Sequence, residues 1–171
     1  NAMGVSVVEV SKSGGDWQVV RPSKYARRIT PHTPMKISGP AKGHTLMRTL
    51  DDPNGEVILG TMQNCANGQT PWGTYLTCEE NWSDIFVKKG ERTALEKRYG
   101  ISDKDEVYRW NEFDKRFDAN ETPNEPNRFG WVVEIDPFDP TSTPVKHTAL
   151  GRFKHEGAEM VVAENGQVAV Y

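Results

Sequence analysis

Residues 65–81 read CANGQTPWGTYLTCEEN and contain both cysteines of the chain, a run of turn-forming residues and two adjacent acids. Within this stretch, the β-branched and aromatic residues of 73–78 predict a strand. An apolar, β-branched run at residues 56–62 predicts another strand. The Asn-, Gly- and Pro-rich residues 65–72 between them predict a loop. The segment is therefore interpreted as a strand, a loop and a strand.

The composition limits the class of protein. At 171 residues the chain can form one domain with a core, or part of a larger one. The hydrophobic fraction of 36%, with 15 Gly and 11 Pro, indicates short elements joined by turns and argues against a helical bundle. A net charge of −3 supplies no basic field for nucleic acid and suits cation binding better. No apolar run is long enough to cross a bilayer, so no membrane partner is expected.

Two hairpins are predicted from turn chemistry. The residues SGGD at 13–16 separate two β-branched runs within residues 4–22, which predicts one antiparallel pair. Asn165-Gly166 lies between two apolar runs within residues 158–171 and is the strongest hairpin signal. Further strands are predicted at residues 130–136 and 145–149. Because no long helix separates the strands, the sequence predicts an all-β fold, a sandwich or a propeller.

The remaining stretches lack a strand period. Residues 22–45 contain several prolines and are predicted to form an ordered loop. Residues 82–128 are rich in charge and are predicted to be a surface insertion, with a short helix at 93–99 that ends at Gly100. Residues 120–128, NETPNEPNR, resemble a linker. The first three residues are interpreted as a tag remnant and a start Met, which leaves residues 4–171 as the domain.

The two cysteines permit three explanations: a disulfide across a hairpin, buried packing, or a metal site. On a strand, alternation places Cys78 on the face of Leu76 and Glu80, which indicates packing, with Glu79 on the opposite face. Cys65 lies in the predicted loop and is the better ligand candidate. The adjacent acids form either a solvated strand end or ligands. A thiolate with carboxylates suits iron or zinc together with calcium, because calcium alone would not use sulfur.

His155-Glu156-Gly157 is a third feature with an acid. The sequence HEGAE lacks the second histidine that a helical zinc motif needs, so these residues are interpreted as a surface turn. Neither a nucleophile elbow of the form GxSxG nor a phosphate-binding loop of the form GxxxxGK occurs in the sequence.

Several blocks of sequence resemble the PhoX-type bacterial alkaline phosphatases. The blocks are GVSVVEV, DWQVVRPSKYARRIT, HTPMKISGPAKGH, NCANGQTPWGTYLTCEENW, FGWVVEIDP and RFKHEGAEMVV. The resemblance extends from about Gly4 to Tyr171. The block around Cys65 is long and unusual in composition, which makes it highly specific.

The resemblance implies a fold, an activity and a set of metal ligands. Members of this family are large β-propellers, exported from the cytoplasm, that hydrolyse phosphate esters with a cluster of iron and calcium ions. For this chain it implies that Cys65 binds iron, that Glu80 serves the cluster with Glu79 as a close second, and that Glu156 does likewise. A periplasmic or secreted protein acting on phosphate-ester small molecules is therefore expected.

A four-stranded blade takes roughly 40 residues or more, so this chain is expected to hold about two to three blades, from the N-terminal part of the family's propeller. Alone it is expected to lack activity, to hold metals weakly and to self-associate through an exposed strand edge near residues 168–171. Two alternatives stay open: a non-catalytic binding or structural propeller, and a calcium-dependent propeller lactonase or esterase.

Overall fold

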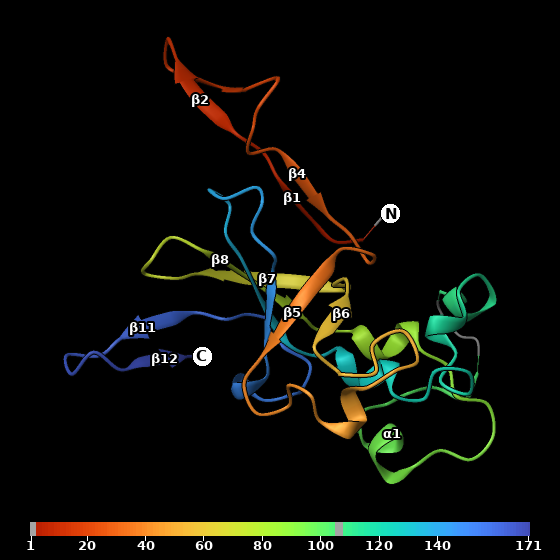
Figure 1. Cartoon of the computed structure of the whole chain (residues 1–171). Helices are drawn as coiled ribbons and strands as arrows, with labels where there is room; N and C mark the ends of the chain where they lie inside the picture. Colours follow the sequence, from red (N-terminus) through yellow and green to blue (C-terminus); the bar gives the residue numbers. More distant parts are fainter. Residues whose placement is uncertain (1–2, 105–107) are drawn as a thin grey trace.

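The computed structural model describes residues 3–104 and 108–171. It is mostly β-sheet with few helices, as the sequence predicted, and its centre is a six-stranded sheet (Figure 1). In spatial order the strands are β6 (Val57–Leu59), β5 (Pro34–Ser38), β10 (Val145–His147), β9 (Val132–Ile135), β8 (Tyr75–Glu79) and β7 (Asn64–Gln69). Strands β5 and β10 are parallel, and the other neighbours are antiparallel. The described residues do not form a closed propeller.

Three two-stranded ribbons lie outside this sheet. They are β1 (Val5–Val7) with β4 (Arg27–Ile29), β2 (Val10–Ser13) with β3 (Asp16–Val19), and β11 (Met160–Val162) with β12 (Val168–Val170). In Figure 1 the β2–β3 ribbon stands away from the sheet, and the β11–β12 ribbon extends to one side of it. The β2–β3 and β11–β12 hairpins confirm the two turns predicted at SGGD and Asn165-Gly166. The prediction of a single pair over residues 4–22 was incomplete, because β1 pairs with β4 instead.

The predicted loop at residues 22–45 was wrong in part, since it contains β4 and β5. Pro34 is the first residue of β5, a position where the missing N–H does not break the ladder. The next residues alternate between exposed and buried, with Met35 and Ile37 in the core. Because of the prolines, the sequence pattern did not predict this short strand, although it did exclude a helix there.

The helices are few and short, and the remaining segments are turns and irregular structure. The α-helix α1 (Ala94–Arg98) confirms the predicted helix, and its N-terminus carries a capping box between Thr93 and Glu96. The 3-10 helices are η1 (Thr45–Met47), η2 (Trp82–Ile85), η3 (Trp110–Glu112), η4 (Lys115–Phe117), η5 (Glu125–Arg128) and η6 (Thr148–Leu150). Of the described residues, none belongs to a helix long and apolar enough to cross a membrane.

Residues 82–128 contribute a core, which the prediction of a surface insertion did not anticipate. A cluster of buried apolar side chains joins this segment to the end of the sheet; its members are Met62, Trp82, Ile85, Phe86, Ile101, Phe117 and Phe129. Ring contacts within the cluster include Phe86 with Phe117 and with Phe129, at centroid distances of 5.7 and 5.4 Å. The aromatic residues were present in the sequence, but their spacing followed no helix or strand period.

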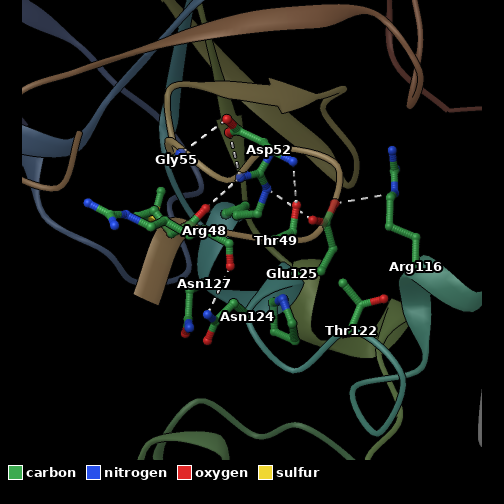
Figure 2. Close-up of polar contacts among 12 residues, drawn as sticks. Arg48, Thr49, Asp52, Gly55, Arg116, Thr122, Asn124, Glu125 and Asn127 are labelled. Carbon is green, nitrogen blue, oxygen red and sulfur yellow. Dashed lines mark hydrogen bonds and ion pairs between the residues drawn. The ribbon is translucent and has the colours of Figure 1, made fainter. Parts of the chain in front are cut away.

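The linker predicted at 120–128 is instead held by buried charges (Figure 2). Arg128 contacts the Glu125 carboxylate through Nε at 3.0 Å and the Asp52 carboxylate through Nη1 at 3.0 Å. Arg116 reaches the other oxygen of Glu125 at 3.3 Å. This network ties η5 and η4 to the loop before β6. A cavity of about 350 Å³ beside it is lined by Arg116, Arg128, Asp52 and Glu125 among others, and these four side chains already pair with one another, so the network is structural.

Candidate functional site

Cys65 lies on strand β7, so the predicted loop around it was wrong for residues 65–69. The register between β7 and β8 shifts between Asn64 and Asn67, and two residues of β7, Cys65 and Ala66, face the single residue Cys78 of β8. This is a β-bulge, a feature that re-aims side chains and is frequent next to active sites. Residues typical of turns can thus form a strand where the strand is bulged and at the edge of the sheet.

Both cysteines are free thiols, and their environments differ. Cys78 is fully buried beside Leu76, Val132 and Ala158, which agrees with the predicted packing role. Burial, with a smaller contribution from Cys65, raises the pKa of the Cys78 thiol to about 11. Cys78 is therefore a neutral apolar side chain at ordinary pH.

Cys65 is exposed, and two carboxylates act on its thiol. Glu80, the residue after β8, raises the pKa of Cys65 through hydrogen bonding and negative charge, and Glu156 acts in the same direction through its charge. Glu80 thus lies within hydrogen-bonding reach of Cys65, and Glu156, in the segment before β11, acts on the same thiol only through its charge. Their role as metal ligands stays a prediction.

The donor chemistry of these three residues fits iron, and their geometry is open. One thiolate and two carboxylates are ligands that iron accepts, and the carboxylates also suit calcium. Within residues 3–104 and 108–171, however, no three side chains of His, Cys, Asp or Glu are grouped closely enough to hold a metal ion by themselves. Additional ligands would be needed to enclose a cation.

Glu79 does not belong to this group, and the structure gives it another task. It is fully buried, and one carboxylate oxygen accepts hydrogen bonds from the backbone N–H groups of Gly130 and Trp131 at 3.0 and 3.1 Å. The other oxygen accepts from Lys146 Nζ at 2.7 Å. Alternation along the strand explains why its neighbour Glu80 points the other way. Both oxygens of Glu79 are bound by protein donors, which leaves it a structural carboxylate.

Lys146, the partner of Glu79, was not predicted from the sequence. Its ammonium also donates to the backbone carbonyl of Arg128 at 3.0 Å and lies 4.0 Å from the centroid of the Phe129 ring. Burial lowers the pKa of Lys146, against the opposing effect of Glu79. A lysine in a short strand gives no sequence signal of complete burial.

Two residues just before the bulge were also missed. Gln63 has a backbone φ of 55°, which is unusual for a residue with a side chain, and its carbonyl accepts the N–H of Glu80 at 3.0 Å. The side-chain atoms Nε2 of Gln63 and Oδ1 of Asn64 are buried without a hydrogen-bond partner. Such features gather at functional sites, and none has a signature in the sequence.

The predicted surface turn at 155–157 is buried in part. His155 is almost fully buried, and its Nε2 lies 3.0 Å from the carbonyl of Gly151. Its ring packs against Phe153 at a centroid distance of 3.6 Å, and burial lowers its pKa. Glu156 is exposed and lines a cavity of about 100 Å³ with Tyr171. The buried histidine thus anchors the segment that presents Glu156.

Comparison with known proteins agrees with the resemblance seen in the sequence. A family model described as alkaline phosphatase PhoX matches residues 1–171. Among solved structures, the chain is similar to Pseudomonas fluorescens PhoX in complex with vanadate, a transition state analogue, with a TM-score of 0.95 and 56% sequence identity. That match covers 98% of this chain and 30% of the other, so the chain spans less than a third of the solved relative. No curated protein matches the chain.

Proposed function

Because the chain belongs to the PhoX alkaline phosphatase family, we propose that the complete protein hydrolyses phosphate monoesters at a metal centre to which Cys65, Glu80 and Glu156 contribute. The observation that carries the proposal is the action of both carboxylates on one exposed thiol beside a bulge. The vanadate complex of the relative, a transition state analogue, supports phosphoryl transfer as the reaction.

Iron and calcium are the metals that this donor set suits. The Cys65 thiolate would bind iron, and the carboxylates of Glu80 and Glu156 would bind iron or calcium. When bound, the cations would neutralise charge on the phosphoryl oxygens and activate an oxygen nucleophile. The chain's own contribution is to hold these three side chains on one side of the site, with Cys65 turned outward by the bulge.

The fold that accompanies this function is a partial β-propeller. A four-stranded blade needs roughly 40 residues or more, so 171 residues correspond to about two or three blades of the complete propeller. Since a polynuclear site needs ligands from several directions, this chain alone would bind iron and calcium weakly and lack phosphatase activity. We place the complete protein in the periplasm or outside the cell, acting on phosphate-ester small molecules.

The test uses the full-length protein and a matched pair of cysteine variants. Cys65→Ala should lose iron and hydrolysis of an aryl phosphate, measured by elemental analysis and product absorbance with and without calcium. Cys78→Ala should keep both, because its thiol is buried in an apolar cluster. A Cys65→Ala protein that keeps its iron and turnover would overturn the ligand assignment, and a wild-type protein without metal or activity would favour a non-catalytic propeller.

A further inference from the structure

We infer that Gln63 is a positioning residue whose left-handed backbone holds Glu80 beside Cys65. The inference rests on the proposed function, because it concerns the same three side chains. Gln63 would contact no reacting atom, and its unusual feature is its backbone conformation.

The backbone at Gln63 is unusual among the described residues. Of the non-glycine residues in 3–104 and 108–171, only Gln63 and Arg109 have a positive φ, at 55° and 51°. Residues that have a Cβ rarely adopt a positive φ, and such backbone outliers persist where the surrounding structure fixes them. Arg109 lies in an exposed turn, whereas Gln63 comes directly before strand β7 and its bulge.

Two hydrogen bonds fix the conformation of Gln63. The amide Nδ2 of Asn64 donates to the hydroxyl of Thr61 at 2.8 Å and closes the chain around Gln63. The carbonyl of Gln63 accepts the backbone N–H of Glu80 at 3.0 Å. Thr61 is fully buried, so this bend is anchored in the core.

The bend at Gln63 connects the segments that carry Cys65 and Glu80. Gln63 is two residues before Cys65 on β7, and its carbonyl binds the backbone of the residue that carries the Glu80 carboxylate. If residue 63 took an ordinary extended conformation, its carbonyl would turn away from the N–H of Glu80. The two strands would then lose a backbone hydrogen bond at the end where Cys65 and Glu80 meet, and the pairing of Asn64 with Glu79 would be the last to hold that end.

Three substitutions separate this backbone role from a side-chain role. Glycine and asparagine tolerate positive φ, whereas valine is a genuine outlier there. In the full-length protein, Gln63→Gly and Gln63→Asn should keep the iron content of the wild type. Gln63→Val should bind iron roughly 10-fold more weakly, in the range found when groups that orient metal ligands are lost. Gln63→Gly also removes the buried amide, so its iron content shows whether that amide matters.

A second readout needs no metal and no activity. In full-length protein stripped of metal, Glu80→Cys combined with Cys78→Ala places a second thiol beside Cys65. Thiol–disulfide exchange with a small disulfide reagent should join the thiol at position 80 to that of Cys65 in a disulfide, while the reagent is reduced to its two thiols. Peptide mass spectrometry detects the link. Adding Gln63→Val should slow this closure by about 10-fold, because reaction between two held groups depends steeply on their alignment. Adding Gln63→Gly should leave it unchanged.

The outcomes distinguish this inference from the proposed function. Wild-type protein without iron contradicts the proposed function, while the thiol-linking experiment still tests Gln63. Folded Gln63→Val protein that links as fast as its parent overturns the inference. Loss of iron and of linking in Gln63→Gly, with an unchanged thermal midpoint, overturns it too, since the side chain would then be responsible. Should Gln63→Val fail to fold, the glycine and asparagine variants decide the question by the same two measurements.

Discussion

The ammonium of Lys146 donates to the carboxylate of Glu79 at 2.7 Å, and neither side chain reaches solvent. This pair links β10 to β8 across the intervening strand β9. Glu79 also accepts two backbone N–H groups, and Lys146 also donates to a carbonyl. Both oxygens of Glu79 and two of the three N–H donors of Lys146 are thereby hydrogen-bonded, which offsets the cost of burying the ion pair.

Removing one member of this pair should destabilise the protein strongly. We expect Lys146→Met to lower the free energy of unfolding by about 3–5 kcal/mol, because the Glu79 charge would stay buried without its partner. Urea unfolding followed by circular dichroism measures the loss. Combining it with Glu79→Gln should recover part of the stability, since no buried charge then remains unpaired. A double variant that is less stable than Lys146→Met by the full cost of Glu79→Gln would contradict this coupling.

Stability should depend on pH through Asp52. Burial alone would raise the pKa of this carboxyl, but hydrogen bonds from the N–H of Val57 and from Arg128 lower it below its usual value. A carboxylate with a lowered pKa contributes stability above its unfolded pKa, near 3.8, and loses it as the pH falls through the folded pKa. We expect Asp52→Asn to cost about 1–3 kcal/mol at neutral pH. That difference should shrink as the pH falls below about 4.

Urea unfolding at neutral pH and again below about pH 4 measures the effect of Asp52 on the free energy of unfolding. Asp51→Asn is the matched control, because no hydrogen bond or ion pair is described for its exposed carboxylate, and it should change the free energy of unfolding little at neutral pH. A stability difference between Asp52→Asn and wild type that stays constant from neutral to acid pH is incompatible with the linkage.

Gly130 should tolerate no side chain. Its φ is 91°, and a Cβ at this position would lie 2.5 Å from Nε1 of the buried Trp82. We expect Gly130→Ala to cost about 3 kcal/mol or more from backbone strain and overpacking together. Gly166 is the matched control: its φ is 80°, but nothing lies within 4 Å of the added Cβ, so Gly166→Ala should cost only about 1–2 kcal/mol. Equal losses in thermal unfolding would mean that contact with Trp82 does not matter.

Local chemistry made some of this fold predictable from sequence. Gly14-Gly15 forms a two-residue turn between the paired residues Ser13 and Asp16, and Asn165-Gly166 lies in the longer turn closed by Ala163 and Gln167. Both hairpins were predictable because a tight turn depends on the residues within it. Strand β7 was missed because its Asn and Gly residues are also turn formers, and only pairing with β8 makes them a strand. The core of residues 82–128 was missed because its aromatic residues meet through irregular 3-10 turns.

The candidate site was predictable in its donors and not in its support. Alternation separated Glu80 from Glu79, yet sequence could not show that Lys146 neutralises Glu79. The left-handed conformation of Gln63 has no signature, because glutamine is uncommon in that region. The sequence gives the chemical type of each candidate ligand directly, whereas burial and backbone strain arise from tertiary contacts.

The 171-residue chain should associate through its β11–β12 hairpin. Among the described strands β12 pairs only with β11, which leaves its other edge open. Large apolar side chains on this hairpin are exposed, with Val161 at 50% and Tyr171 at 79%. An open edge with apolar side chains favours pairing with another chain. Sedimentation should therefore show a mass that increases with protein concentration.

Two charge substitutions locate the contact. Val168→Lys on β12 should shift the chain toward monomer, because a lysine on an edge strand opposes pairing. Val10→Lys on β2, another exposed hairpin, is the matched control and should leave the association unchanged. Dispersal by Val10→Lys but not by Val168→Lys would assign the contact to the β2–β3 hairpin. A monomer at every concentration would show that the exposed edge of β12 does not associate.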